Sequence, residues 1–335
     1  MTVLQPAAPK KFDEHFNNIK IILIFTVVLG HFSEIFFRDH FAYNAIYEII
    51  YAFHMPMFII VTGYFSKNAD KARSKAFSEI LIPYVLFEIF MSLGESVMKG
   101  EFTFPDIFTP QTAAWYLIST FLWRMLLKDV IKIRYNIVFF MLLSLYIGFL
   151  PGVTNMFSLD RTIVFFPYFL VGYYFDERAK NIINKIPYFI AAILFAAACF
   201  GVTFISRPMA FSAYSQMGMT VFEGVGERLG MYFVALFMSA MLYRIIPKKR
   251  QFFSFIGPYT MTVFLLHTFV KMAVANNKTQ FDGLNPYVGI VLFVLLSAIL
   301  TVLLGNKYVF AVYKWCIDLC KKIIFKKRMV INNEN

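Results

Sequence analysis

Long apolar runs alternate with short polar segments along most of this 335-residue chain. As helices, many of these runs are long enough to cross the roughly 30 Å hydrocarbon core of a bilayer. Cutting the runs at clusters of charge, proline and glycine predicts an all-α integral membrane protein with ten transmembrane helices in one bundle. The predicted spans are residues 19–37, 45–65, 79–98, 112–127, 136–151, 161–176, 186–205, 226–246, 252–273 and 286–304.

The distribution of lysine and arginine tests the number of spans. With ten spans and a cytoplasmic N-terminus, 25 of the 32 basic residues fall in cytoplasmic loops or ends. Cytoplasmic loops are normally enriched in these residues, and an odd number of spans or an outside N-terminus would destroy the partition. Both termini are therefore predicted to be cytoplasmic. The basic residues left outside are Arg38, Lys99, Arg161, Arg207, Arg228, Lys271 and Lys278.

Composition supports a membrane environment rather than a nucleic-acid partner. Hydrophobic residues make up 59% of the chain, charged residues make up 16%, and the mean hydropathy is +0.63. These values lie outside the usual balance of a soluble domain. The net charge of +12 is spread over short loops between apolar runs, where it suits the cytoplasmic leaflet. Lipid is the expected partner, and nucleic acid is not.

Three segments are expected along the chain. Residues 1–18 form a polar cytoplasmic segment without a cleavage site for removal, and residues 19–305 form the membrane domain. Residues 306–335 form a basic tail whose apolar and basic faces suit the inner membrane interface. The three cysteines show no metal-binding spacing, so neither a disulfide framework nor a structural zinc is indicated.

Three histidines lie inside predicted spans, where ionisable residues are costly and often functional. His31, His54 and His267 fall at roughly 16 to 22 Å from the cytoplasmic edge, so they could share one cavity. A neutral histidine can accept the proton of an attacking hydroxyl, although each could instead hydrogen-bond between helices. Glu34 and Glu48 lie near the outer ends of the first two spans, where they could orient a histidine, although an interfacial position is favoured.

Several motifs resemble the membrane-bound acyltransferase-3 family. Lys20 and His31, within NNIKIILIFTVVLGHF, are spaced as in the first helix of that family. The stretch YAFHMPMFIIVTGYF is similar to its histidine-methionine-proline segment. Later landmarks follow in order, so the resemblance covers roughly residues 12–305, and its closest branch is the fucose 4-O-acetylase-like and bacterial polysaccharide acetyltransferases. These landmarks are LIPY at 81–84, AWYL at 114–117, FPYFLVGYYF at 166–175 and IGPYTMTVFLLH at 256–267.

The resemblance implies transfer of an acyl group, acetyl in particular, from cytoplasmic acyl-CoA to a hydroxyl of a cell-surface glycan or its lipid-linked precursor. It also implies a multi-pass protein of a bacterial plasma membrane. Acyl-CoA is a co-substrate, and no permanent cofactor or metal is expected. His31 corresponds to the catalytic base, Lys20 to the basic position of the first helix, and His54 and His267 to residues lining the site. His267, Tyr259 or a backbone N–H would stabilise the oxyanion.

Two departures from the family pattern matter. Asn17 stands where the family commonly has aspartate, and Asn17 cannot supply a charge, which leaves Asp13 as a candidate replacement. The arginine pair expected before the third span is replaced by Lys71, Arg73 and Lys75. These three residues are candidates for binding the CoA phosphates, or they are ordinary cytoplasmic charges.

Two other functions remain open. A transporter or exporter of polysaccharide or a small solute could use the same buried histidines to relay protons, although no inverted repeat supports it. A catalytically silent member of the fold could act in a glycan-assembly complex. The outer loop around 206–225 could contact a polar ligand or simply join two spans, and the sequence leaves a homo-oligomer open.

Overall fold

The computed structural model describes residues 13–36, 39–102, 104–151, 156–204, 211–281 and 283–325, and every regular element among them is helical. The all-α prediction is therefore confirmed for the described residues. The first twelve residues, the tail beyond residue 325 and residues 206–210 of the outer loop lie outside them. The α-helices are α1 (Glu14–Ile35), α2 (Phe41–Tyr64), α3 (Ala69–Ala76), α4 (Ile82–Lys99), α5 (Trp115–Val130), α6 (Asn136–Ile147), α7 (Leu159–Tyr174), α8 (Glu177–Asn184), α9 (Tyr188–Val202), α10 (Val221–Ile245), α11 (Thr260–Asn276), α12 (Pro286–Leu304) and α13 (Lys307–Ile324).

Five short segments complete the helical structure. A π-helical turn, η1 (Phe77–Leu81), joins α3 to α4, so that residues 69–99 form one long helix. The other four are 3-10 turns at the starts of helices or in connections. They are η2 (Thr112–Ala114), η3 (Met156–Ser158), η4 (Ser254–Tyr259) and η5 (Lys278–Phe281).

Fewer helices than predicted can cross a bilayer by their length and composition. Among the described residues five qualify, namely α1, α2, the continuous α3–α4 helix, α10 and α12. The pair α8 and α9, bent by 90°, would add a sixth. The ten-span prediction is not confirmed, although each of the ten predicted ranges overlaps a helix. The other helices are shorter, and the 12-residue α6 rises only about 18 Å, less than the hydrocarbon thickness of roughly 30 Å.

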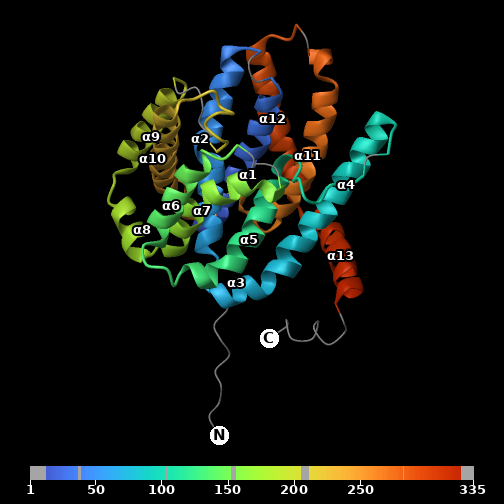
Figure 1. Cartoon of the computed structure of the whole chain (residues 1–335). Helices are drawn as coiled ribbons and strands as arrows, with labels where there is room; N and C mark the ends of the chain where they lie inside the picture. Colours follow the sequence, from blue (N-terminus) through green and yellow to red (C-terminus); the bar gives the residue numbers. More distant parts are fainter. Residues whose placement is uncertain are drawn as a thin grey trace.

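Helix α2 is the centre of the bundle and packs on α1, α7 and α10 (Figure 1). Its contact with α7 depends on two glycines, one on each helix, that lie against the backbone of the other helix. A Cβ added to Gly63 would collide with the carbonyl oxygen of Phe169, and one added to Gly172 would collide with that of Ile60. Small residues permit this close approach of two helix backbones inside a membrane. The contact fixes α2 and α7 relative to each other, and both helices contribute to the candidate site.

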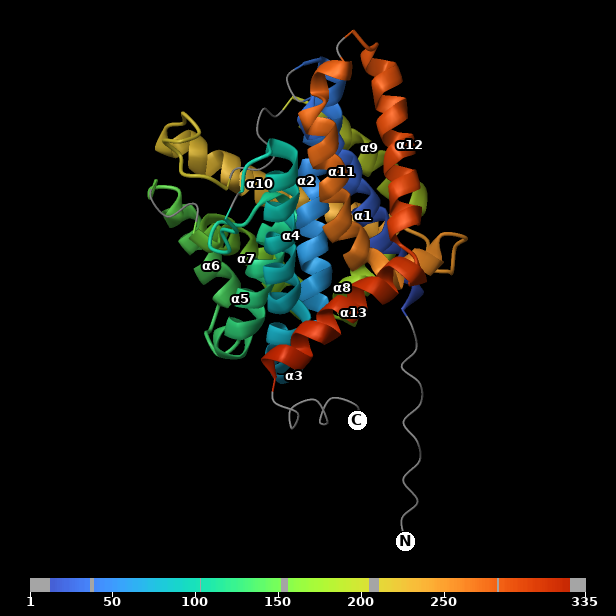
Figure 2. The ribbon, with the colours of Figure 1, turned by 90° about the vertical axis from the view of Figure 1, so that its right-hand side faces the viewer.

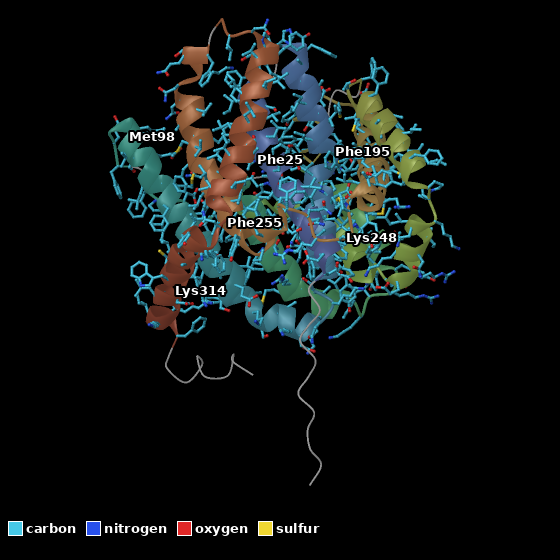
Figure 3. All side chains as sticks on the ribbon, turned by 180° about the vertical axis from the view of Figure 1, so that it is seen from behind. Phe25, Met98, Phe195, Lys248, Phe255 and Lys314 are labelled. Atoms are coloured by element: carbon cyan, nitrogen blue, oxygen red, sulfur yellow. The ribbon has the colours of Figure 1, made fainter. Side chains whose placement is uncertain are left out.

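The remaining helices pack around this centre. Helices α11 and α12 pack on α1, while α5 packs on α3 and α7. Helix α13 runs obliquely across the bundle and contacts α4 and α11 (Figure 2). Seen from behind, Lys314 on α13 and Met98 near the end of α4 lie toward opposite ends of the molecule (Figure 3). The first half of α4 lies beside α13.

Candidate active site

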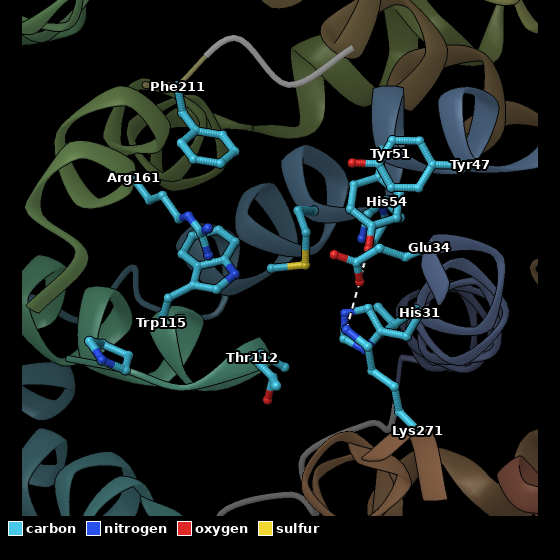
Figure 4. A pocket seen from close by; sticks show the side chains of 14 residues that line it. His31, Glu34, Tyr47, Tyr51, His54, Thr112, Trp115, Arg161, Phe211 and Lys271 are labelled. Atoms are coloured by element: carbon cyan, nitrogen blue, oxygen red, sulfur yellow. Dashed lines mark hydrogen bonds and ion pairs between the residues drawn. The ribbon is translucent and has the colours of Figure 1, made fainter. Parts of the chain in front are cut away.

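A cavity of about 220 Å³ lies inside the bundle, between α1, α2, α7, α11 and the loop that precedes α5 (Figure 4). Ionisable and aromatic side chains from segments far apart in sequence line it. Such a mixture of apolar walls and a few converging polar groups is typical of a ligand site. The ionisable lining residues are His31, Glu34, His54, Arg161 and Lys271.

The central feature of the site is a direct contact between two histidines. His31 lines the cavity, whereas His267, which was expected to line the site, is fully buried and is absent from the lining. His31 Nδ1 lies 2.8 Å from His267 Nε2, and His267 Nδ1 lies 2.8 Å from the carbonyl oxygen of Val263. A carbonyl oxygen can only accept, so His267 Nδ1 carries a proton and, in the neutral ring, His267 Nε2 is an acceptor. His31 Nδ1 must then donate to it. Neutral His31 consequently keeps the lone pair on its Nε2, where it can accept a proton.

The third membrane histidine, His54, lines the same cavity as His31. His54 Nδ1 is 2.7 Å from the carbonyl oxygen of Ile50, one turn earlier on α2, so this nitrogen donates. The ring packs edge-on against Tyr51 and is buried. The structure thus brings together the three histidines whose common depth was noted from the sequence.

A hydrogen-bonded ion pair lies beside the histidines. Glu34 Oε2 is 2.6 Å from Lys271 Nζ and also accepts a hydrogen bond of 3.1 Å from the Tyr51 hydroxyl. Glu34 was expected at the interface and instead lines the cavity, while Glu48 is absent from the lining. Lys271 and Arg161 had been counted as outer charges. Both residues lie inside predicted spans, so the sequence already indicated that they could be functional.

The wall opposite His31 is aromatic and carries Arg161, the third residue of α7 (Figure 4). Its guanidinium lies 4.5 Å from the ring centre of Phe211 and 5.4 Å from that of Trp115. Arg161, Phe211 and Pro110 also line a second, polar cavity of about 290 Å³. This second cavity includes part of the outer loop, because Phe211, Ser212 and Gln216 belong to it.

The loop preceding α5 closes one side of the cavity through Pro110, Thr112 and Ala113. Thr112 has a φ of +43°, which is unfavourable for a residue with a branched Cβ. The backbone N–H of Gln111 donates to Glu88 Oε1 at 3.0 Å, and Glu88 is fully buried in α4. Glu88 was not recognised from the sequence, although a carboxyl group in the middle of a predicted span is unusual. It holds this loop against the bundle.

A separate basic cavity of about 460 Å³ lies where α2 ends and α3 begins. Lys71 and Lys75 line it, together with Lys67 and Arg124. Arg73 is not part of this lining and instead forms an exposed ion pair of 3.4 Å with Asp129. The Nε of Arg124 is buried without a hydrogen-bond partner among the described residues.

The remaining sequence-predicted residues lie away from the histidines. Asn17 donates to the Ser254 carbonyl oxygen at 2.8 Å, and Lys20 donates to that of Gly257 at 3.3 Å. Both therefore attach the start of α1 to η4, and Tyr259 at the end of η4 packs on Phe310 of α13. Asp13 caps α1 by accepting from the Phe16 N–H. The presence of asparagine instead of aspartate at position 17 thus removes no group from the histidine cavity.

Comparison with known proteins adds one finding to this geometry. The model of a family described as an acyltransferase domain matches residues 13–305, which include every helix that contributes to the three cavities. No curated protein and no solved structure matches the chain. Within the described segments, no group of three or more His, Cys, Asp or Glu side chains is arranged to hold a metal ion.

Proposed function

Because the chain belongs to the acyltransferase-3 family, whose members are membrane acyltransferases, we propose that it transfers an acyl group from acyl-CoA to a hydroxyl of a glycan. The acyl group is acetyl, as in the fucose 4-O-acetylase-like branch, and the acceptor is a cell-surface glycan or its lipid-linked precursor. One observation carries the proposal. His31 lines a cavity inside the bundle and contacts His267 through its Nδ1, so that the Nε2 of His31 stays free to act as a base.

In the proposed reaction, His31 Nε2 removes the proton of the acceptor hydroxyl while the hydroxyl oxygen attacks the thioester carbonyl carbon. The new C–O bond forms, the C–S bond breaks, and the proton passes from His31 to the departing CoA thiolate. His267 maintains the reactive tautomer of His31, as the third member of a nucleophile–base–orienter arrangement does. Lys271 also lines this cavity and has three N–H donors, of which Glu34 occupies one. It is our candidate for stabilising the tetrahedral oxyanion.

The basic cavity is the proposed binding site for the phosphates of CoA. Lys67 and Lys71 supply positive charge there, and so does Lys75, which also pairs with Glu79 of the same cavity at 2.8 Å. Arg124 offers a donor that has no partner among the described residues. Along α2, Tyr64 in this cavity lies ten residues after His54 in the histidine cavity, which corresponds to about 15 Å of helix. Tyr116, Thr120 and Arg124 follow each other at four-residue spacing on one face of α5. This polar face is the proposed path of the pantetheine arm.

The acceptor is proposed to enter from the other side of the membrane. The polar cavity next to Arg161 lies on the side of the outer loop and supplies hydroxyl and amide groups from Thr109, Ser158 and Gln216. This arrangement agrees with a ten-span topology in which both termini are cytoplasmic and the shorter helices also cross, aided by local thinning of the bilayer. The proposed location is the plasma membrane of a bacterium.

Acyl transfer by the purified protein tests this function directly. The protein, reconstituted in nanodiscs, is incubated with radiolabelled acetyl-CoA and a glycan fraction, and label in the glycan is measured. We expect transfer that depends on His31. An exporter or a catalytically silent member of the fold would release no CoA and would label no glycan, so that result would reject the proposal. Mass spectrometry of surface glycans from cells with and without the protein then locates the modified sugar.

A further inference from the structure

The Arg161 side chain packs on aromatic rings, and the nearby carboxylates of Asp160 and Glu34 stabilise its charge without bonding to it. Its guanidinium lies on the ring of Phe211 and near that of Trp115. Within the described part of the chain, no hydrogen bond or ion pair engages this side-chain charge. Two aromatic faces therefore orient the guanidinium, and its planar set of N–H donors remains available at the cavity wall.

The carboxylates around this cavity are already engaged. Glu34 is bound to Lys271 and Tyr51. Asp160, in the adjoining polar cavity, accepts a 2.7 Å hydrogen bond from the backbone N–H of Arg161 rather than from its side chain. A partly buried guanidinium whose N–H donors have no acceptor is unfavourable. Its fork of donors fits two oxygens of a carboxylate or phosphate. An oxyanion of the ligand is the partner that this geometry lacks.

The position of Arg161 indicates which part of the reaction it serves. It lines both the histidine cavity and the polar outer cavity, and it lies on the wall across from His31 (Figure 4). A group on that wall does not adjoin the proton-accepting nitrogen of His31, so it suits a part of the acceptor remote from the reacting hydroxyl. The hydroxyl and amide groups of Ser158, Ser212 and Gln216 next to it suit a sugar.

We propose that Arg161 binds a carboxylate or phosphate oxyanion of the acceptor, so that the preferred acceptor is an acidic glycan. This inference rests on the proposed acyltransferase function and adds the chemical class of its acceptor. The oxyanion could belong to an acidic sugar or to the phosphate that links a sugar to a lipid. Arg161 is thus a specificity-determining residue that positions the acceptor hydroxyl toward His31.

Binding measured without any acyl donor tests the inference independently of catalysis. The probes are methyl glucuronide, methyl glucoside and glucose 1-phosphate, titrated against the protein in nanodiscs by calorimetry. The first two differ in a single carboxylate, and the third tests the phosphate source. We expect one charged probe to bind at least ten times more tightly than the glucoside. Arg161→Gln should weaken that probe by about 10- to 100-fold, the range for hydrogen bonds between charged groups, and leave the glucoside unchanged.

Two further variants separate recognition from folding. Arg161→Lys keeps the charge but not the paired donors, so it should show an intermediate loss. Arg134→Gln removes an exposed arginine that stacks on its neighbour Tyr135 and should behave as wild type. Equal binding of charged and neutral probes to the wild type, binding of neither charged probe, or an equal loss for all probes in Arg161→Gln would overturn the inference. Acyl transfer to neutral glycans as efficient as to acidic ones would overturn it while leaving the proposed function intact.

Discussion

His31 Nδ1 and His267 Nε2 lie 2.8 Å apart, although 236 residues separate them in the sequence. The carbonyl oxygen of Val263 fixes the proton on the other nitrogen of His267, and this in turn fixes the proton of His31. The contact therefore transmits a backbone constraint from α11 to the proton-accepting nitrogen on α1. In the proposed mechanism, this contact prepares His31 as a base without a carboxylate partner.

Replacing His31 by alanine should abolish most acyl transfer. If His31 is the base, turnover should fall by about 10² to 10⁴-fold, the range for losing a positioned proton acceptor, with little change in acyl-CoA binding. Transfer of labelled acetyl in nanodiscs measures this, after size-exclusion chromatography has shown that the variant is monodisperse. His40→Ala is the matched control, since His40 lies outside the cavity at the start of α2. Near-normal turnover of His31→Ala would reject the mechanism.

Replacing His267 should affect the same step less strongly and in a way that depends on the substitute. His267→Ala removes the acceptor for His31 Nδ1, so we expect turnover to fall by about 10- to 100-fold, typical when a histidine loses its orienting partner. His267→Gln can offer an amide oxygen to His31 and an amide N–H to the Val263 carbonyl oxygen. It should therefore recover part of the activity. An equal loss in both variants would argue that His267 acts by packing alone.

The two lysines of the basic cavity should control the apparent affinity for the donor. Lys71→Gln combined with Lys75→Gln should raise the Michaelis constant for acetyl-CoA by about 10-fold or more and change turnover little, because phosphate contacts act equally in ground and transition states. Arg73→Gln is the control on the same helix, since Arg73 pairs with Asp129 away from the cavity. A Michaelis constant that stays constant in the double variant would assign these lysines to membrane topology only.

Reporter tags test the proposed topology. Tags at positions 70 and 250 and at the C-terminus should report the cytoplasm, and tags at 40, 155, 215 and 280 should report the outside. The charge distribution supports this partition, whereas the length and composition of the helices support five or six spans among the described residues. Position 250 is decisive, because a tag there reporting the outside would eliminate the ten-span arrangement.

The sequence predicts the helices better than it predicts their relation to the membrane. Apolar runs locate the helices of the ten predicted ranges, but the polar helices α3 and α8 lie in predicted loops. The apolar runs do not reveal where a helix ends early, as α6 does after 12 residues, or where two segments bend by 90°, as α8 and α9 do. Those features depend on contacts with neighbouring helices. The number of spans consequently remains a prediction from charge.

The candidate site also has features that could be predicted from the sequence and features that could not. The common depth of His31, His54 and His267 could be estimated from the helical rise, because each lies on a regular helix. Arg161 and Lys271 were missed because charges near span ends were counted with the loops. The loop at 109–114 carries no periodic signal, and it is held beside the histidines by tertiary contacts that include the hydrogen bond to Glu88 and the packing of η2 on α11. Such contacts cannot be derived from spacing along the chain.

That hydrogen bond leads to a prediction for Glu88, which is fully buried and whose Oε1 accepts the N–H of Gln111. Glu88→Ala leaves this N–H without its partner, which should cost about 1 to 3 kcal/mol of stability and loosen the cavity wall formed by Pro110 and Thr112. We therefore expect a lower Tm and a higher Michaelis constant for the acceptor.

Two substitutions complete the test of this loop. Glu88→Gln keeps a carbonyl oxygen as the acceptor for Gln111 and removes the carboxyl group, so it should retain most of the stability and acceptor affinity of the wild type. Glu95→Ala controls for loss of a carboxylate on the same helix, because Glu95 pairs only with Lys99 on the surface. Thermal unfolding in detergent and acceptor titrations measure both effects. If Glu88→Gln is as damaging as Glu88→Ala, the acid itself is required and the loop-anchoring role is wrong. If neither variant differs from Glu95→Ala, the loop is held in place by other contacts.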